Sequence, residues 1–423
     1  MQMTMTQKIL SAATGREVIP GDVLNAPVSG VAIHDNAPLG LFDAYPDARV
    51  WDPSKIVICY DHFSRTKMAQ YHGRIRAFAR EQGIPPENIF GPGRHGISHQ
   101  VPGEEGFVLP GTIYAVFDTQ GATLGAFNCF AFTSLFTTPS VLALGTALLV
   151  VPEVIDIELT GHLPPGLTSK DLTFHLHALL GDQISGRVLE FRGTGVATLS
   201  IDQRMGVANA ANNLGAFTMM FPGDEVLGVY LRTRARAPYQ FVAADPGATY
   251  ASTVTIDLDG VPALVSGPGD IDNIRALDEV VGLPVAAAFV GSCSAGRLDD
   301  LVLAARVLDG RSIDESVRFV VTPISQEVML EASARGVIAT LVAAGAMVTP
   351  PGCGACYHAN QSPLLLADGE RCIASSVSNA PGRMGSKSAE IYLSNPAVVA
   401  ASALEGRIAD PRPYLRDVRK AGQ

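Results

Sequence analysis

The chain has 423 residues, and its 47% of hydrophobic and 17% of charged residues are typical of a globular protein with two or three domains. A net charge of −10, with no stripe rich in Lys or Arg, excludes a general nucleic-acid binder. Residues 1–22 lack the apolar core of a signal peptide, and the most apolar stretch, 141–155, is interrupted by Gly145 and Pro152. We therefore expect a cytoplasmic protein without membrane spans, in which six cysteines are too few for a disulfide scaffold.

A strand followed by a helix is predicted several times along the chain. In the first example, Ile56 to Tyr60 form a buried strand, Ser64 caps the following helix and Gly83 ends it. The same outline recurs at 112–132, 284–310 and 318–336. Strands that alternate with helices predict parallel sheets with both faces covered, and therefore the α/β fold class.

The middle of the chain has a more mixed pattern. Thr168 or Ser169 is the predicted cap of an amphipathic helix, and residues 250–260 alternate as a strand does. We predict three domains: an α/β domain over 1–150, a mixed α/β domain over 151–280 and an α/β region over 281–423.

Polar and nucleophilic side chains follow the predicted strands at their carboxyl ends, where ligands bind in open parallel sheets. Asp61 and His62 follow the first strand, Asp118 follows the second, and Ser292 and Cys293 follow a third. A purely structural loop would show mainly Gly, Asn and Ser at such positions. These residues are therefore the first candidates for a functional site.

Three cysteines come from two predicted loops. Cys353 and Cys356 lie in the sequence PPGCGAC, and Cys293 lies sixty positions upstream in GSCSAG. Two prolines precede the pair, so it does not begin a helix as a redox C-x-x-C motif does. Three thiols instead favour an iron–sulfur cluster or a soft metal ion, and zinc remains an alternative with Cys372 or His358 as the fourth ligand.

The pattern G-S-C-x-x-G-R, followed by P-G-C-G-x-C, resembles the cluster-binding signature of the aconitase superfamily. Within it, the chain is most similar to the large subunits of 3-isopropylmalate dehydratase and homoaconitase. The similarity runs nearly from end to end, through segments that occur in family order: QKILSAATGREVIPGDV (7–23), GISHQV (96–101), PPGLTSKDL (164–172), GSCSAGRLDDL (291–301), PGCGAC (351–356) and YLSNPAVVAASALEGRIADP (392–411).

The resemblance implies an aconitase-like fold, with three α/β/α domains around an iron–sulfur site and without the swivelling fourth domain of single-chain aconitases. It also implies a [4Fe–4S] cluster held by Cys293, Cys353 and Cys356. The fourth iron has no protein ligand in this family, so it acts as a Lewis acid on the substrate's hydroxyl. The implied activity is that of a hydro-lyase on a small anionic hydroxy acid, completed by a separate small subunit.

Removal of water also needs an acid for the hydroxyl and a base for the neighbouring C–H. By the resemblance, Asp61 and His62 match the Asp–His pair that helps to protonate the hydroxyl, and His99 and Asp118 match a second pair. Arg383 matches a family arginine whose guanidinium binds a substrate carboxylate. The same pocket is expected to include Asn379, Ser378 and Ser292.

Several positions in this pocket depart from the family pattern. Gln120 stands where the family usually has a histidine, and Asp202 is the expected carboxylate partner of that position. Ala295 replaces an asparagine beside the cluster, and Ser378 stands where a further arginine is common. Because Gln120 cannot shuttle a proton and a lost arginine weakens recognition of one carboxylate, we expect a different, less highly charged hydroxy acid as substrate.

Two alternatives remain open. One is a 3-isopropylmalate or homoaconitate dehydratase proper. The other is a family member that keeps the fold and the cluster but has lost catalysis and serves in binding or sensing. The retained acid–base residues and Arg383 favour an enzyme, whereas Gln120 and Ala295 favour the loss of catalysis.

Overall fold

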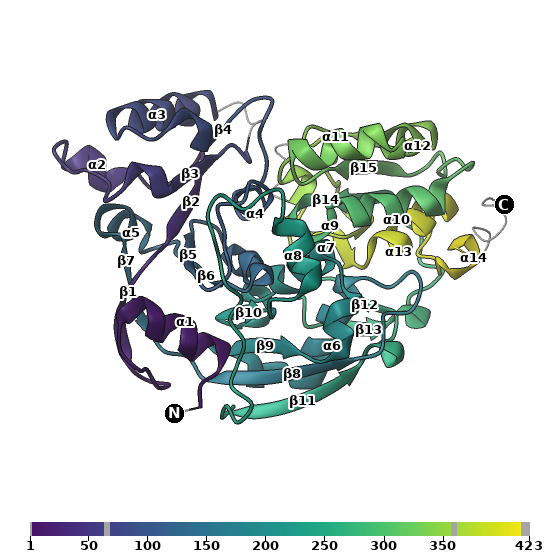
Figure 1. Ribbon diagram of the computed structural model, residues 1–423. Helices are drawn as coiled ribbons and strands as arrows, with labels where there is room; N and C mark the ends of the chain where they lie inside the picture. The colour runs from purple at the N-terminus through teal and green to yellow at the C-terminus, as the bar shows by residue number, and fades with distance from the viewer. Residues whose placement is uncertain (1, 63–67, 357–361, 416–423) are drawn as a thin grey trace. The chain divides into compact units, whose positions relative to one another are not determined.

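The computed structural model describes residues 2–62, 68–356 and 362–415, and the chain divides into two compact units (Figure 1). Unit 1 comprises Met1–His162 and Gly181–Asp257, and unit 2 comprises Leu163–Leu180 and Leu258–Gln423. Both units are built on parallel strands, so the predicted α/β class is confirmed.

The first large sheet of unit 1 has five parallel strands in the order β4-β3-β2-β5-β6. Three of them are buried over their whole length, as expected for a parallel sheet covered on both faces. The strands are β2 (Gly30–His34), β3 (Ile56–Cys59), β4 (Ile89–Phe90), β5 (Ile113–Val116) and β6 (Phe130–Thr133). The helices in this part of the sequence are α2 (Gly40–Ala44), α3 (Met68–Glu81), α4 (Val101–Glu104) and α5 (Thr138–Leu144).

The predicted strand–helix units of this region are largely confirmed. Helix α3 ends at Glu81, and Gly83 stops it in the left-handed conformation, with φ +70°. The predicted cap, Ser64, lies outside the described residues. The helix expected within 112–132 is instead a 3₁₀ helix, η3 (Gly121–Phe127), in which Gly125 approaches the backbone of Met219 too closely for a side chain.

The second large sheet of unit 1 has four parallel strands in the order β10-β9-β8-β11. They are β8 (Val154–Thr160), β9 (Val188–Arg192), β10 (Thr218–Met220) and β11 (Ser252–Asp257), with helices α7 (Ile201–Asn209) and α8 (Glu225–Leu231) between them in sequence. A further antiparallel pair joins β1 (Val23–Pro27) to β7 (Thr146–Val150).

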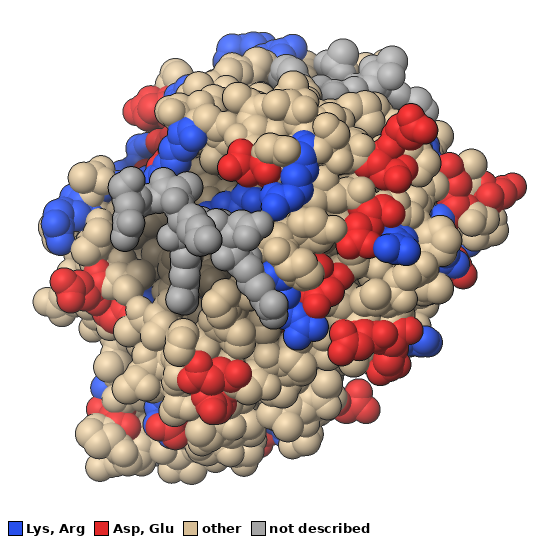
Figure 2. Space-filling view, turned by 90° about the vertical axis from the view of Figure 1, so that its right-hand side faces the viewer, with Lys and Arg blue, Asp and Glu red and all other residues tan. Residues whose placement is uncertain are grey.

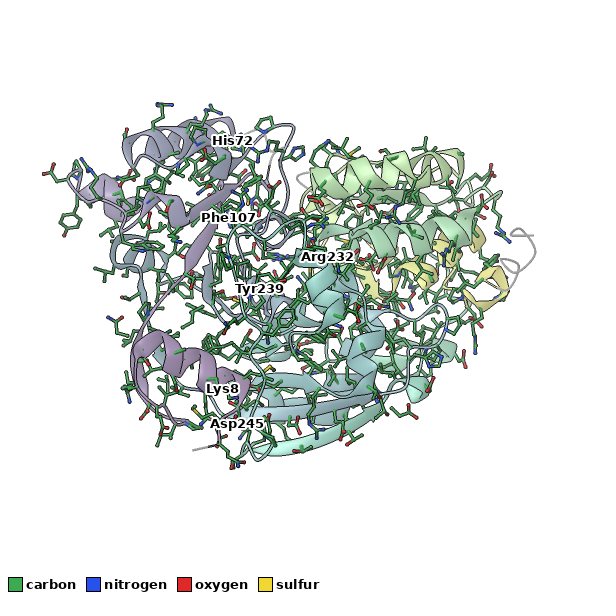
Figure 3. The ribbon with its side chains drawn as sticks, viewed as in Figure 1. Lys8, His72, Phe107, Arg232, Tyr239 and Asp245 are labelled. Carbon is green, nitrogen blue, oxygen red and sulfur yellow. The ribbon has the colours of Figure 1, made fainter. Side chains whose placement is uncertain are left out.

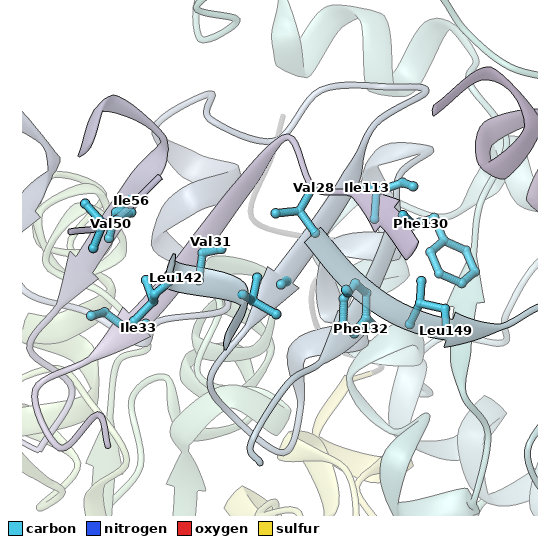
Figure 4. Packing of buried hydrophobic residues seen from close by; sticks show 14 of the residues in the cluster. Val28, Val31, Ile33, Val50, Ile56, Ile113, Phe130, Phe132, Leu142 and Leu149 are labelled. Carbon is cyan, nitrogen blue, oxygen red and sulfur yellow. The ribbon is translucent and has the colours of Figure 1, made fainter. Parts of the chain in front are cut away.

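Helix α1 (Met5–Thr14) is held against the second sheet by a buried carboxylate. The backbone N–H groups of Met5 and Thr6 donate to Glu190 of β9 over 3.0 and 2.7 Å. The N–H groups of the first helical turn have no partner within the helix, so the carboxylate accepts their hydrogen bonds and complements the helix dipole. A large apolar cluster lies in unit 1, with Val31, Ile113 and Phe130 among its fully buried members (Figure 4).

Unit 2 is built on a seven-stranded sheet in the order β13-β12-β18-β17-β14-β15-β16. The five strands from β18 to β16 are parallel, whereas β12 and β13 form an antiparallel edge. The strands are β12 (Leu264–Ser266), β13 (Ile274–Ala276), β14 (Ala287–Gly291), β15 (Arg318–Thr322), β16 (Met347–Val348), β17 (Arg371–Ala374) and β18 (Glu390–Leu393). The helices are α6 (Ser169–Leu180), α9 (Ser292–Ala295), α10 (Leu298–Leu308), α11 (Gln326–Ala334), α12 (Val337–Ala343), α13 (Pro396–Glu405) and α14 (Arg412–Leu415).

The predicted domain boundaries differ from this division. The regions 1–150 and 151–280 each carry a sheet of their own, yet most of both belongs to unit 1. Helix α6 and strands β12 and β13, which we predicted in the middle domain, belong to unit 2. Of the two predicted caps of α6, Thr168 is confirmed, because its Oγ1 accepts from the N–H of Lys170 over 3.2 Å.

Charged side chains are sparse and mixed in sign on the face shown in Figure 2, in keeping with their 17% share of the sequence. Over the described part of the chain, the model contains no helix both long and apolar enough to cross a membrane.

Candidate active site

Two neighbouring strands of unit 1 end in histidine and aspartate. His34 is the last residue of β2 and pairs in register with Cys59, the last residue of β3. Asp35 follows the first strand, and Asp61 and His62 follow the second shortly after. Parallel strands bring their carboxyl ends to one edge, and the four side chains are accordingly buried with their polar atoms within 4.8 Å of one another.

Asp35 is the centre of this His/Asp cluster. Its Oδ1 lies 3.0 Å from Nδ1 of His62, and its Oδ2 lies 2.8 Å from Nε2 of His72. His72, on α3, is labelled in Figure 3. Asp61 also contacts Nδ1 of His62, at 2.5 Å. Two carboxylates therefore flank one ring nitrogen of His62, and the contact with Asp35 fixes the imidazole.

Asp61 stays ionised in this setting. Burial raises the pKa of its carboxyl, but His62, His34 and the N–H of Ser98 outweigh burial and hold the pKa below its usual value. The four clustered residues offer the ligand types of a divalent cation, but an ion would compete with the contacts that Asp35 and Asp61 already make to His62. The arrangement therefore favours proton transfer over metal binding.

A second pair in unit 1 joins His99 to Asp118, which follows β5. Nε2 of His99 lies 3.5 Å from Oδ1 of Asp118, and Nδ1 lies 3.1 Å from the hydroxyl of Thr123. That hydroxyl also accepts from the side-chain amide of Asn209 over 3.1 Å. The structure thus brings the predicted pair together and fixes the imidazole from both of its nitrogens.

Gln120 has a different partner from the one expected. Its Nε2 donates to Oδ1 of Asn213 over 3.1 Å. The predicted partner, Asp202, lies in the first turn of α7, about 10 Å along the helix axis before Asn209. An amide pair therefore stands where we expected an amide beside a carboxylate, and neither member can shuttle a proton.

The three predicted cluster cysteines lie in segments at the carboxyl ends of β14 and β15 in unit 2. Segments Ser292–Ala295 and Gly354–Cys356 contact one another, and both pack on Thr322, the last residue of β15. A Cβ on Gly291 would lie 2.4 Å from the backbone oxygen of Thr322, and one on Gly354 would lie 2.3 Å from its Oγ1. Only glycine allows this approach, so the glycines let both cysteine-bearing segments pack on Thr322.

Two cationic side chains accompany these thiols. Nη2 of Arg383 lies 3.7 Å from Sγ of Cys356, and Cys353 and Cys293 are also close enough to raise the pKa of the guanidinium against the effect of burial. Lys170 of α6 is buried, and its Nζ donates to Oγ of Ser294 over 2.8 Å and to the carbonyl of Ser376 over 2.5 Å.

Anionic groups lie near the buried amine of Lys170. Burial lowers the pKa of this amine to about 8, although Cys356, Cys293 and Asp300 raise it. An anionic group held by the three thiols would add further negative charge near this amine. An anionic iron–sulfur cluster therefore fits this site, which offers three thiols, two nearby cations and glycines where the cysteine segments pack on Thr322.

The remaining predicted substrate residues have structural contacts. Asn379 donates from Nδ2 to Oγ of Ser266 and to the carbonyl of Asp270, both at 3.0 Å, so its amide anchors the loop before Arg383. Oγ of Ser378 accepts from the N–H of Ala380 over 3.3 Å. Ser292 adopts φ +66°, an uncommon conformation for a residue with a side chain, and it orients the start of the Cys293 loop.

The zinc alternative loses one of its proposed ligands. Cys372 lies in β17 opposite Ala287, at the start of β14, whereas Cys293 follows the far end of that strand. The separation is about 17 Å, from some five residues of strand, so both thiols cannot bind one ion. The other proposed ligand, His358, lies outside the described residues.

Several residues of the site were not predicted: His34, Asp35, His72, Lys170, Asn209 and Asn213. His34 and Asp35 carry the same signal as Asp61 and His62, since a polar pair follows an apolar run. Lys170 has only a weaker signal, a lysine within the family-like segment PPGLTSKDL.

Comparisons with known proteins cover nearly the whole chain. A model of the aconitase family (aconitate hydratase) matches residues 60–282 and 274–406. The 3-isopropylmalate dehydratase large subunit 1 of Methanopyrus kandleri is 39% identical over 424 residues, which cover 98% of this chain and 100% of the relative. A probable methanogen homoaconitase large subunit of Methanothermobacter thermautotrophicus is 38% identical, over 97% of this chain and 98% of the relative. A solved structure, aconitase X of Thermococcus kodakaraensis, aligns over 89% of each chain with 11% identity and a TM-score of 0.48.

Proposed function

Because the chain belongs to the aconitase family and is a hydro-lyase, we propose that it is the large subunit of a [4Fe–4S]-dependent enzyme that dehydrates or hydrates a small hydroxy carboxylic acid. The observation that carries the proposal is the placement of Arg383 and Lys170 beside three thiols from two glycine-shaped loops. This arrangement combines a site for an anionic cluster with a guanidinium for a substrate carboxylate.

Cys293, Cys353 and Cys356 would hold the cluster, which supplies a Lewis-acidic iron for the substrate's hydroxyl when it is bound. Arg383 would bind a carboxylate in two parallel hydrogen bonds and orient the substrate. Lys170 would balance the negative charge of the thiolates from the protein side and keep the Ser294 and Ser376 loops in place.

Unit 1, taken by itself, carries residues suited to proton transfer. His62, held by Asp35 and Asp61, is suited to carry the proton that the departing hydroxyl needs. His99 with Asp118 forms a second imidazole–carboxylate pair that would relay a proton or orient the substrate. The base for the C–H would come from a small subunit, which is supported by the names of the relatives as large subunits.

The proposed substrate carries fewer carboxylates than the acids in the relatives' names. Arg383 is the guanidinium beside the thiols, whereas Ser378 replaces a second one and is engaged with Ala380. Gln120 and Asn213 contribute amides, which recognise hydroxyl or carbonyl groups without adding charge. These residues therefore favour a substrate with a single carboxylate, which Arg383 would bind.

The test is turnover by the anaerobically reconstituted large subunit together with its small subunit. Formation of an unsaturated acid would be followed for 3-isopropylmalate, homocitrate, citrate and a series of monocarboxylic hydroxy acids. We expect conversion of a monocarboxylic member, abolished in Arg383→Gln and weakened in Arg383→Lys, which keeps the charge but not the fork. Efficient conversion of any of the three named acids would refute the substrate class and leave the hydro-lyase assignment intact.

A second candidate is a family member with a cluster but without catalysis. The amide pair of Gln120 and Asn213 favours it, because neither side chain transfers a proton. Full cluster loading with no turnover of any acid in the series would support this candidate.

A further inference from the structure

Unit 1 contains a cavity of about 440 Å³ whose lining is both basic and apolar. It lies between α3 and the segment that follows β4. Arg76 and Arg80 come from the helix and Arg94 from the segment. The apolar part is formed by Ala79, Ile84, Ile89, Pro86 and Pro92.

The three arginines of this pocket have no carboxylate partner among the described residues. Within the residues that the structure describes, none of the three forms an ion pair, whereas Arg74 on the same helix is paired with Asp43. Arg76 and Arg80 lie four residues apart on one helix face, where like charges repel. All three side chains are exposed, and together they give the cavity a positively charged rim that an anion would complement.

Two of the guanidinium groups lie beside aromatic rings. The Arg94 guanidinium stacks 4.5 Å above the ring of Phe90, the last residue of β4. Burial raises the pKa of the Tyr60 phenol, and the charge of the nearby Arg76 partly offsets that effect. A stacked guanidinium loses less conformational entropy on binding than a free surface side chain would.

We propose that this pocket binds a small organic anion with a phosphate or carboxylate head and an apolar body. The guanidinium forks match the oxygens of such a head, and the alanine, isoleucine and proline side chains match the body. The proposal is independent of the proposed function, because the pocket uses none of the residues assigned to catalysis.

The pocket adjoins the His/Asp cluster through Tyr60. Tyr60 directly precedes Asp61, and its ring lies 4.5 Å, centroid to centroid, from the ring of His72. His72 in turn contacts Asp35, which holds His62. A ligand in the pocket would therefore contact Tyr60, whose ring packs against His72.

The test uses calorimetric titration of the purified chain with phenyl phosphate, inorganic phosphate and benzyl alcohol. We expect phenyl phosphate to bind at one site, at least tenfold more tightly than either of the other two, which carry only the head or only the body. The double variant Arg80→Gln/Arg94→Gln should weaken phenyl phosphate binding at least tenfold. The matched control Arg74→Gln, on the same helix but paired with Asp43, should leave it unchanged.

Arg383→Gln separates this pocket from the candidate substrate site. Unchanged affinity in this variant supports the proposal, whereas lost affinity would mean that the probe binds beside the cysteines and would overturn it. Absence of phenyl phosphate binding, or equal affinity for inorganic phosphate, would overturn it as well.

Discussion

Replacing Lys170 by methionine should remove a pH dependence of stability from the metal-free protein. The amine is fully buried, and burial lowers its pKa from the ordinary 10.5 to about 8. The folded chain thus releases this proton near pH 8, whereas the unfolded chain keeps it to about pH 10.5. Between these values the unfolded state binds more protons, so the free energy of unfolding rises with pH, by about 3 kcal/mol in total.

The Lys170→Met variant has no proton to release at this position. It loses the hydrogen bonds to Ser294 and Ser376, a loss of about 1–3 kcal/mol at every pH. The free energy of unfolding of the variant minus that of the parent should therefore be about 3 kcal/mol larger at pH 7 than at pH 10.5. Urea unfolding of the metal-free proteins across this range measures the difference, with Lys8→Met, which removes a partly exposed lysine paired with Asp245, as control. Parallel pH curves for the parent and Lys170→Met would refute the reasoning.

Three further predictions concern the site. Asp35→Asn should lower kcat by about 10–100-fold, because it disturbs the partner that orients His62. The control Asp43→Asn, which alters an exposed carboxylate, should leave kcat unchanged. Equal rates in the two variants would contradict the role of Asp35. Gly354→Ala should lower the iron content after reconstitution, because the new Cβ would collide with Thr322. The control Gly369→Ala, at a left-handed position with open space around it, should not lower it. Equal iron contents in the two variants would count against the importance of this loop packing. Ser378→Arg should lower KM for a dicarboxylic hydroxy acid by about tenfold by adding one charge-assisted contact, and an unchanged KM would show that residue 378 does not face the substrate.

Much of the site could be predicted from local sequence, because its residues follow apolar strands or lie in short cysteine motifs. Asp61, His62, Cys293, Cys353 and Cys356 all carry such signals. The central role of Asp35 depends on the register of β2 beside β3, and strand order is not encoded locally. The contact between Gln120 and Asn213 spans 93 positions, and the family resemblance pointed to Asp202 instead.

The fold shows the same division between local and long-range information. The alternation of strands and helices correctly predicted parallel sheets, since burial on both faces dictates continuous apolar runs. The place of α6 in unit 2 could not be predicted, because it depends on partners far along the chain. Asp171 near its start accepts from the side chain of Asn395 over 2.9 Å. Long-range pairs of this kind decide which elements share a unit.

The most direct test of the central claim is the amount of iron and acid-labile sulfide per chain after anaerobic reconstitution. The parent should hold about four of each, which is the content of one [4Fe–4S] cluster. Cys353→Ser should lose most of both, whereas Cys372→Ser, which changes a buried thiol in the middle of a strand, should keep them. One zinc per chain without sulfide in the parent would contradict the account and remove the basis for a cluster-dependent hydro-lyase.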